Sequence, residues 1–355
     1  MPHLTHSMPA TPAAVGYRMP AEWEPHEATW LSWPRPSCLS FPESYQRVLP
    51  ALAKMVDALA ESERVNINVC DARHEEEARR VLNKLRARVE HVTFFHIPTN
   101  EPWCRDHGPV FVTRIEEPRL AIVEWDYNAW GWKYPPFEDD DVVPTRIAEQ
   151  LALPVYSPEM ILEGGSIDIN GAGTLLTTRS CLLNPNRNPD LTQAEIEERL
   201  RSYLGVTHIL WLGDGIEGDD TDGHIDDLTR FVSRTRVVTV VEEDESDANF
   251  QPLRDNLELL RTMVVEDGTP LEVIILPMPA KMIRDGQRLP ASYANFYVAN
   301  KVVLLPVFAD TNDKWAIAVL ERAFPTRRVI PIDCRELIWG LGAFHCLTQQ
   351  QPRVG

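Results

Sequence analysis

Four short polar segments of the sequence carry side chains that are able to do chemistry. They read "NEPWCRDHGP" (100–109), "LEGGS" (162–166), "DTDGHID" (220–226) and "GAFHCLTQQQP" (342–352). Each lies between stretches with the apolar spacing of strands or helices, so we interpret all four as loops, where binding and catalytic groups concentrate. Together they supply one thiol, one imidazole and three carboxylates, from Cys346, His224, Asp106, Glu163 and Asp226.

This set of side chains favours a nucleophilic thiol that acts on a cationic substrate. The nucleophile would be the thiolate of Cys346, which needs a neighbouring cation or histidine in order to form. Carboxylates beside a thiol raise its pKa, which is useful only if the substrate itself brings positive charge. A guanidinium group is planar, carries five N–H donors and pairs with carboxylates in bidentate fashion. We therefore expect a small cationic guanidine as the substrate.

The expected chemistry gives each of the five side chains one role. Cys346 attacks the guanidinium carbon, His224 protonates the leaving ammonia, and the same histidine then activates water to release a urea-type product. Glu163 would orient His224, whereas Asp106 and Asp226 would hold the guanidinium nitrogens. This scheme uses no metal ion and no organic cofactor.

Other interpretations of these segments stay open at the level of sequence. Cys346 could be a buried structural thiol, and Cys104, close to His107, is a rival nucleophile. The acidic run "GDGIEGDDTDG" (213–223) offers oxygens to calcium, although it lacks the twelve-residue order of an EF-hand with its terminal glutamate. Trp103 lies three residues before Asp106 and is a candidate substrate-binding residue, with a place in the core as the alternative.

Composition narrows the class of protein further. The chain has 355 residues and a formal net charge of −18, which argues against a nucleic-acid partner, since phosphates need a basic face. Six cysteines without a CxxC pair argue against a structural zinc site. No apolar run approaches the roughly 20 residues that span a bilayer. The first 16 residues lack a basic start followed by an apolar stretch, so we expect a flexible arm over 1–16, no membrane partner and a cytoplasmic location.

Hydrophobic spacing predicts alternating helices and strands along the chain. Helices are expected over 44–61, 74–85, 141–153, 192–205 and 314–322, and strands over 64–70, 91–98, 110–114, 120–127, 208–212, 236–241, 271–277, 301–308 and 328–333. The segment 163–178 is expected to form a strand, a glycine turn and a second strand. This gives about five units of strands plus one helix, roughly 60 to 75 residues each, and indicates a single α/β domain over 17–355. A doubly wound sheet is the alternative architecture.

Several further motifs, in the same order along the chain, resemble a known family. They are "YRMPAEWEPHEATWLSWP", "WCRDHGP", "NAWG", "LEGGSI", "GTLLTT", "LLNPNRNP", "GDDTDGHID", "LPASYANFYVAN" and "HCLTQQQP". With them the sequence resembles the agmatine deiminases, within the bacterial-type peptidylarginine deiminase family of guanidine-modifying enzymes. The resemblance implies a five-bladed pseudo-symmetric α/β propeller with a central site. It also implies a homodimer that hydrolyses agmatine to N-carbamoylputrescine and ammonia, a step toward putrescine.

The matching motifs assign the same five residues that the chemistry selects. By resemblance, Cys346 is the nucleophile, His224 is the general acid and base, and Asp226, Asp106 and Glu163 complete the site. We also expect Thr348 and the glutamines at 349–351 to shape the turn and to bond to backbone around the thiol.

The chain departs from the family pattern near the expected pocket. Leu341 and Ala343 replace a glycine and an asparagine before the cysteine, Glu101 replaces an aspartate, Asp168 a histidine and Asp227 an asparagine. These positions leave the preferred guanidine open. The alternatives are deimination of peptidyl arginine or of free arginine, transfer of the amidino group to an amine, and non-catalytic binding of a guanidine or polyamine.

Overall fold

The strands form five sheets that share one plan, in a computed structural model that describes residues 10–355. In each sheet, the first two strands along the sheet are antiparallel, and the next strand is parallel to the second. A parallel neighbour needs a crossover, and a helix supplies it each time. The described strands therefore do not build one continuous sheet, and the doubly wound alternative is wrong.

The first sheet contains both ends of the described chain. Its order is β18 (Thr348–Pro352), β1 (His26–Ser32), β2 (Arg64–Val69) and β3 (Val92–His96). Residues of β18 pair antiparallel with β1, from Thr348 opposite Leu31 to Pro352 opposite His26. The last strand of the chain thus joins the first one.

The other four sheets follow in chain order. They contain β4 (Val110–Thr113), β5 (Leu120–Val123) and β6 (Val155–Tyr156); β7 (Ile167–Ile169), β8 (Thr174–Thr178) and β9 (His208–Leu212); β10 (Thr229–Ser233), β11 (Arg236–Val241) and β12 (Glu272–Pro277); and β15 (Tyr297–Val298), β16 (Val302–Val307) and β17 (Arg328–Asp333). A separate hairpin joins β13 (Ile283–Arg284) and β14 (Gln287–Arg288).

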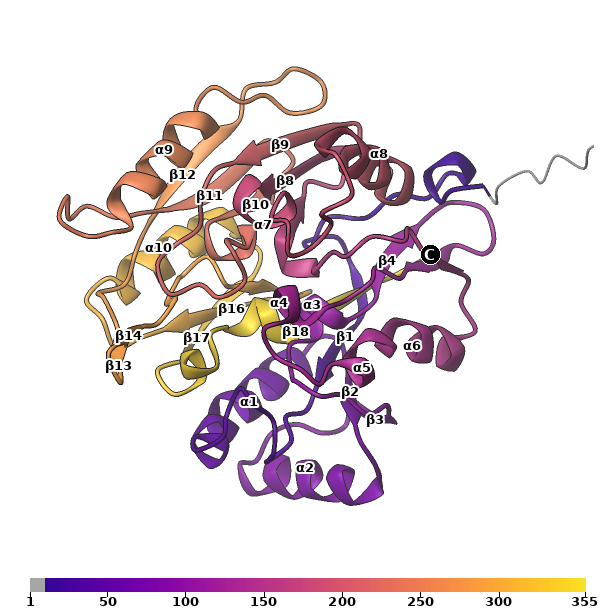
Figure 1. Cartoon of the computed structure of the whole chain (residues 1–355). Coiled ribbons are helices and arrows are strands. Elements are labelled where there is room, and N and C mark those ends of the chain that lie inside the picture. Colours follow the sequence, from indigo (N-terminus) through magenta and orange to yellow (C-terminus); the bar gives the residue numbers. More distant parts are fainter. Residues whose placement is uncertain (1–9) are drawn as a thin grey trace, which may run out of the picture.

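The longer helices are the crossovers, and most of them lie round the outside of the molecule (Figure 1). They are α1 (Tyr45–Leu59), α2 (Ala72–Lys84), α6 (Val143–Leu151), α8 (Gln193–Leu204), α9 (Phe250–Leu260) and α10 (Asp313–Ala323). All but α9 were predicted. Helix α8 shows why: Thr192 and Glu195 form a capping box at its start, and Gly205 ends it in the left-handed region.

Short helical turns lie near the middle of Figure 1, inside the ring of longer helices. They are α3 (Cys104–His107), α4 (Ala129–Trp132), α7 (Arg179–Leu182) and α11 (Phe344–Leu347), while α5 (Glu138–Asp141) precedes α6. The 3-10 helices are η1 (Ala13–Val15), η2 (Gly164–Ser166), η3 (Ile225–Asp227) and η4 (Leu337–Gly340). Three of the predicted loop segments therefore contain a single turn of helix directly before a strand, at α3, η3 and α11, and the fourth contains η2.

Two expectations about the chain ends and membranes meet the structure only in part. Residues 1–9 of the expected arm lie outside the described residues, and the described part contains the short helix η1. Among the helices of residues 10–355, none combines the length and the apolar character that crossing a bilayer requires.

Candidate active site

The five predicted residues come from four equivalent places in the fold. Asp106 lies on α3 before β4, Glu163 lies directly before η2 and β7, His224 and Asp226 lie at η3 before β10, and Cys346 lies on α11 before β18. Each place is the loop that enters the first strand of a sheet. Because the sheets share one plan, this loop carries each residue toward the middle of the molecule, where α3, η2, η3 and α11 are in contact.

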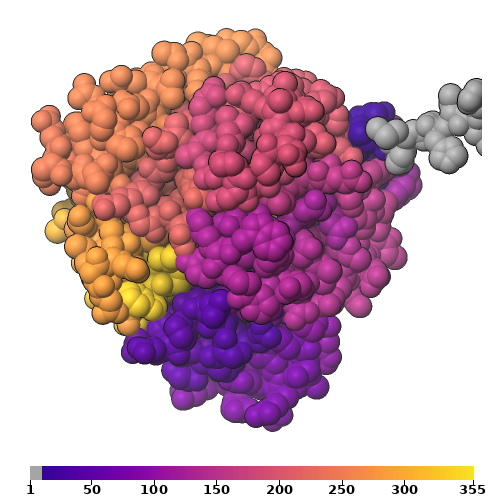
Figure 2. Space-filling view, viewed as in Figure 1, coloured from indigo at the N-terminus to yellow at the C-terminus, as the bar shows by residue number. Residues whose placement is uncertain are grey.

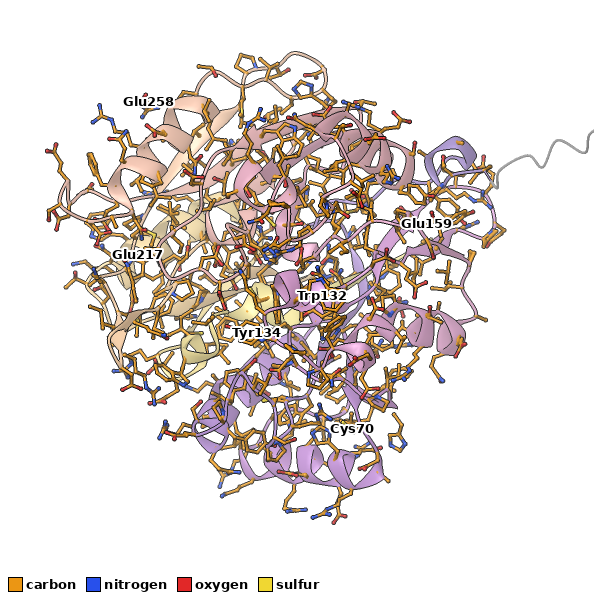
Figure 3. The ribbon with its side chains drawn as sticks, in the orientation of Figure 1. Cys70, Trp132, Tyr134, Glu159, Glu217 and Glu258 are labelled. Carbon is orange, nitrogen blue, oxygen red and sulfur yellow. The ribbon has the colours of Figure 1, made fainter. Side chains whose placement is uncertain are left out.

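A cavity of about 220 Å³ leads to Cys346 and Asp106. It is lined by the aromatic residues Trp103, Trp130, Tyr134 and Trp339, the acidic residues Glu101, Asp106 and Asp220, and Leu341 and Cys346 among others. Tyr134 lies near the centre of the view in Figure 3. The C-terminal segment, yellow in Figure 2, reaches the same face between the indigo and orange segments. No lysine, arginine or histidine is among the described residues that line this cavity.

Trp103 lines the cavity as predicted, and glycines of the C-terminal loop make room for it. Its indole Nε1 donates to Ser40 Oγ at 2.8 Å. A Cβ at Gly342 would lie 2.6 Å from the Trp103 ring, so only glycine allows this approach. Leu341, between two glycines, has φ 70° and lines the cavity, whereas Ala343 is fully buried and does not.

Asp106 is held by two donors from different loops. The backbone N–H of Gly165 donates to Oδ1 at 3.0 Å, and the indole Nε1 of Trp130 donates to Oδ2 at 3.0 Å. Gly165 is a close-approach glycine: a Cβ there would lie 2.6 Å from His224 Nδ1, 2.7 Å from Asp106 Oδ1 and 3.0 Å from Asp226 Oδ2. The glycine pair is therefore more than a bend in the chain.

His224 lies between carboxylates without a close hydrogen bond. Its Nδ1 is 3.7 Å from Asp106 Oδ1 and 4.0 Å from Asp226 Oδ1. Burial by itself would lower the pKa of His224, but the carboxylate of Asp106, the thiol of Cys181 and the carboxylate of Asp226 raise it well above its ordinary value. The imidazole therefore carries a proton at neutral pH, as a general acid must.

Glu163 lies near His224 but bonds to an arginine. The Nε of Arg187 donates to Glu163 Oε1 at 2.6 Å, and both side chains are buried. One ligand atom each from Glu163, Cys181 and His224 lie within 4.8 Å of one another, which is a possible set of metal ligands. Since Arg187 already occupies one carboxylate oxygen, we keep the prediction that the chemistry needs no metal.

Cys346 is next to Asp226, and a histidine fixes that aspartate from the other side. The Cys346 thiol lies 3.6 Å from Asp226 Oδ2, and the same oxygen is 2.7 Å from His345 Nδ1. His345 Nε2 is in turn 2.8 Å from Glu22 Oε2. Burial raises the pKa of the Cys346 thiol well above its ordinary value, and the charges of Asp226, Asp227 and Asp106 add to this effect. In the free protein the thiol is therefore protonated.

Several buried polar atoms of the site have no hydrogen-bond partner within the described chain. They are Glu163 Oε2, both ring nitrogens of His224 and Asp226 Oδ1. Buried polar groups are nearly always paired in folded proteins, so a cluster of unpaired ones marks a place for a polar ligand. Burial also raises the pKa of Asp106 to about 6, against the attraction of His224, so this carboxylate is ionised only above mildly acidic pH.

The structure disfavours the rival nucleophile and the calcium site. Cys104 is fully buried and does not line the cavity, and burial raises its pKa to about 12. In the acidic loop, Asp219 accepts from backbone N–H groups of residues 221, 223 and 224, while Asp222 accepts from Asn186, Arg187 and Lys133. These oxygens already hold the loop in place.

Sequence reasoning missed four residues that contact the site. They are Trp130, Arg187, Asn295 and His345. His345 and Asn295 lie within motifs of the family resemblance, and that position was the available signal. The expectation for the glutamines was wrong in its partners. Gln349 and Gln350 accept from the guanidinium of Arg105, and Gln351 accepts from Trp30, so they bond to side chains; only Thr348 bonds to backbone, at Phe344 and His345.

The sequence and the fold match those of known proteins over nearly their whole length. A model of the family described as Porphyromonas-type peptidyl-arginine deiminase matches residues 18–352. A putative agmatine deiminase of Legionella pneumophila is 34% identical and covers 98% of both chains. An agmatine deiminase of Medicago truncatula is 35% identical over 97% of this chain and 98% of its own. The structure of the agmatine deiminase of Enterococcus faecalis superposes with a TM-score of 0.91 at 32% identity, over 98% of this chain and 99% of that chain.

Proposed function

The chain belongs to the Porphyromonas-type peptidyl-arginine deiminase family, and from that premise we propose that it hydrolyses agmatine to N-carbamoylputrescine and ammonia. The protein is then a hydrolase of the guanidino C–N bond, and its product lies one step from putrescine.

The composition of the cavity is the observation that carries this choice of substrate. Carboxylates and aromatic rings line it, and the described lining has no lysine, arginine or histidine. Agmatine carries a guanidinium at one end and an ammonium at the other, and both cations suit such a lining. Free arginine would place its carboxylate against Glu101 or Asp220 without a partner cation, which is unfavourable in a partly dry cavity.

In the first half of the proposed reaction, the thiol of Cys346 adds to the guanidinium carbon. Asp106 and the unpaired Oδ1 of Asp226 accept hydrogen bonds from the guanidinium nitrogens. The charge of the bound substrate offsets these carboxylates, so the thiol ionises beside it. The sulfur–carbon bond forms, His224 gives its proton to one nitrogen, and the carbon–nitrogen bond breaks to release ammonia.

In the second half, water replaces the sulfur. His224, now neutral, removes a proton from a water molecule as it attacks the carbon of the amidino–cysteine. The tetrahedral species collapses with release of the Cys346 thiolate, and the product keeps one oxygen from water as its urea carbonyl. Glu163 holds the charge of the His224 imidazolium, and Arg187 fixes Glu163. Trp103 packs beside the bound guanidinium.

We further propose that the five sheets are the blades of one five-bladed α/β propeller. Their common strand plan and the closure of the first sheet by β18 support this arrangement. The propeller would be one catalytic domain over 17–355. The absence of disulfides among the six cysteines suits a cytoplasmic enzyme. A homodimer stays a prediction from the family resemblance.

Ammonia release from purified protein tests the substrate directly. Agmatine, free arginine and a blocked arginyl peptide are compared at equal concentration, and we expect turnover with agmatine and at least a hundredfold lower kcat/KM with the other two. Cys346→Ala is expected to lose all turnover, whereas Cys334→Ala, a buried cysteine distant from the cavity lining, should keep it.

The other outcomes separate the alternatives. Preference for arginine or for the peptide would keep the mechanism and change the substrate. Product formation that appears only after an amine is added would indicate an amidino transferase. Binding of agmatine without turnover, unchanged in Cys346→Ala, would indicate a non-catalytic binder and would overturn the proposal.

A further inference from the structure

The common plan of the sheets points to a fifth loop that should also face the site. In four sheets, the loop that enters the first strand carries Asp106, Glu163, His224 with Asp226, or Cys346. The fifth sheet begins at β15, and the loop before it is "ASYANF" (291–296). Its residue Asn295 is fully buried and lies two positions before the strand, as Cys346 lies two positions before β18.

Asn295 organises the turn that presents the nucleophile. Its side-chain Oδ1 accepts from the backbone N–H of Ala343 at 3.2 Å and from that of Cys346 at 3.3 Å. Its own backbone carbonyl accepts from the N–H of His345 at 3.2 Å. Three backbone donors of the Cys346 turn therefore end on one residue.

These bonds also decide which way the amide faces. Because two N–H donors point at one end of the Asn295 amide, that end must be the oxygen. The opposite end is the NH₂ group, and it lies 3.0 Å from Cys346 Sγ and 3.1 Å from Asp227 Oδ1. The side chain thus aims an N–H donor at the reacting sulfur.

The position of Asn295 is itself fixed by its neighbours. Arg230 is buried and donates to the carbonyl of Phe296 at 2.8 Å and to that of Ala294 at 3.4 Å. The hydroxyl of Ser292 donates to the carbonyl of Asp227 at 2.7 Å, which ties the loop to η3. A donor that cannot turn away costs no reorganisation when the sulfur becomes charged.

We propose that Asn295 is a catalytic residue that stabilises the thiolate of Cys346 through its side-chain N–H. A neutral amide donor favours the thiolate over the thiol, since hydrogen bonds to a charged acceptor are stronger than those to a neutral one. The other groups near the sulfur, Asp226 and Asp227, act in the opposite direction. Asn295 therefore supplies what the carboxylates of the site withhold, and it does so before and after the substrate cation is present. This role rests on the proposed function of Cys346 as the nucleophile.

The rate of iodoacetamide alkylation against pH tests the proposal, with Cys346 followed by peptide mass spectrometry. The midpoint of this profile reports thiolate formation, and its high-pH plateau reports access to the sulfur. We expect Asn295→Ala to raise the midpoint by about one to two pH units, which is the value of one hydrogen bond to a charged group. The plateau should stay close to that of the unaltered protein.

Two further variants separate this role from simple support of the turn. Asn295→Asp keeps an oxygen for the N–H groups of Ala343 and Cys346 and replaces the donor, so its midpoint should also rise. Asn256→Ala is the matched control, since Asn256 is a buried asparagine that bonds to backbone at Gly213 and Asp214, in a loop that it braces. It should lower the melting temperature without moving the midpoint.

An unchanged midpoint in both Asn295 variants would overturn the proposal, as would a lower plateau with the same midpoint. Alkylation requires no turnover, so its outcome is independent of the substrate. If the unaltered protein releases no ammonia from any guanidine while the midpoint still depends on Asn295, the proposed function fails and the role of Asn295 as a thiolate donor stands.

Discussion

At the scale of single residues, the site is built from charges that oppose one another. Burial raises the pKa of Asp106 to about 6 and raises that of the Cys346 thiol well above its ordinary value. The same carboxylates raise the pKa of His224. The resting site therefore holds a proton on both the acid and the nucleophile, and it lacks one positive charge that the guanidinium supplies on binding.

The ionisation of Asp106 should appear in the pH dependence of activity. Protonated Asp106 cannot pair with a guanidinium, so kcat/KM should fall as pH drops through about 6. The same group affects stability in the opposite sense. Its folded pKa lies above its unfolded value, so its stabilising contribution is present in acid and is lost as pH rises through about 6. A profile of kcat/KM that stays flat down to pH 4.5 would contradict the assignment.

Gly165 permits the close packing of the three catalytic side chains. In Gly165→Ala the new methyl would lie within 3.0 Å of His224, Asp106 and Asp226, so at least one of them must move. We expect kcat/KM to fall by about a hundredfold or more, since displacements near 1 Å have that effect. The control is Gly213→Ala, where the nearest atom to an added Cβ is Asn256 Oδ1 at an ordinary 3.4 Å. Equal activity in both variants would show that the packing at Gly165 is not needed.

At the scale of elements, local signals determined which parts of the fold could be predicted. Helix α8 has a capping box and a terminal glycine, and the predicted strands over 208–212, 236–241 and 328–333 match β9, β11 and β17 residue for residue. Helix α9 was missed because its sequence, "FQPLRDNLELL", places a proline in the first turn and exposes Leu259. Strand β18 was missed because polar glutamines become strand only through pairing with β1 and through acceptor bonds to Arg105 and Trp30.

The candidate site divides in the same way. The five predicted residues carry their chemistry in their side chains, so residue type and motif point to them without a structure. Trp130, Arg187 and Asn295 depend on contacts across 24 to 51 positions of the chain. Spacing within one segment cannot reveal such contacts. The repeated plan of the sheets can, because it sends the loop before each first strand to the same place.

The capping box of α8 gives a stability prediction that is separate from the site. Thr192 accepts from the backbone N–H of Glu195, and the Glu195 carboxylate accepts from Thr192 N–H at 2.8 Å. Thr192→Ala should lower the free energy of unfolding by about 1 kcal/mol with unchanged kcat/KM. Ser44 stands at the same position of α1 but makes no capping hydrogen bond. Denaturant unfolding of Ser44→Ala should therefore differ from the unaltered protein by less than about 0.5 kcal/mol.

At the scale of the whole molecule, Glu22 joins the N-terminal segment to three of the sheets. Its Oε2 accepts from Arg230 Nη2 at 2.8 Å and lies 2.8 Å from His345 Nε2 and 3.4 Å from Arg105 Nη2. Its Oε1 accepts from the N–H of Val298 at 2.8 Å. Burial alone would raise the pKa of Glu22, but the charges of Arg230, His345 and Arg105 lower it well below its ordinary range.

Removing this charge should destabilise the fold as a whole. In Glu22→Gln two buried guanidinium groups lose their shared counter-charge, and we expect a loss of about 3 to 5 kcal/mol in the free energy of unfolding at neutral pH. Because the folded pKa of Glu22 is depressed, its contribution is present above the unfolded pKa and is lost as pH falls through the folded one. The variant should therefore lose less stability than the unaltered protein when both are titrated from pH 5 toward pH 2.

Glu24→Gln, two residues along the chain, is the matched control for this prediction. Glu24 pairs with Arg18 at the surface at 2.8 Å, and exposed pairs of this kind contribute less than about 1 kcal/mol. Urea unfolding at several pH values compares the two variants. Similar losses for Glu22→Gln and Glu24→Gln would show that the buried cluster does not hold the sheets together, and closure of the molecule would then depend on the pairing of β18 with β1 alone.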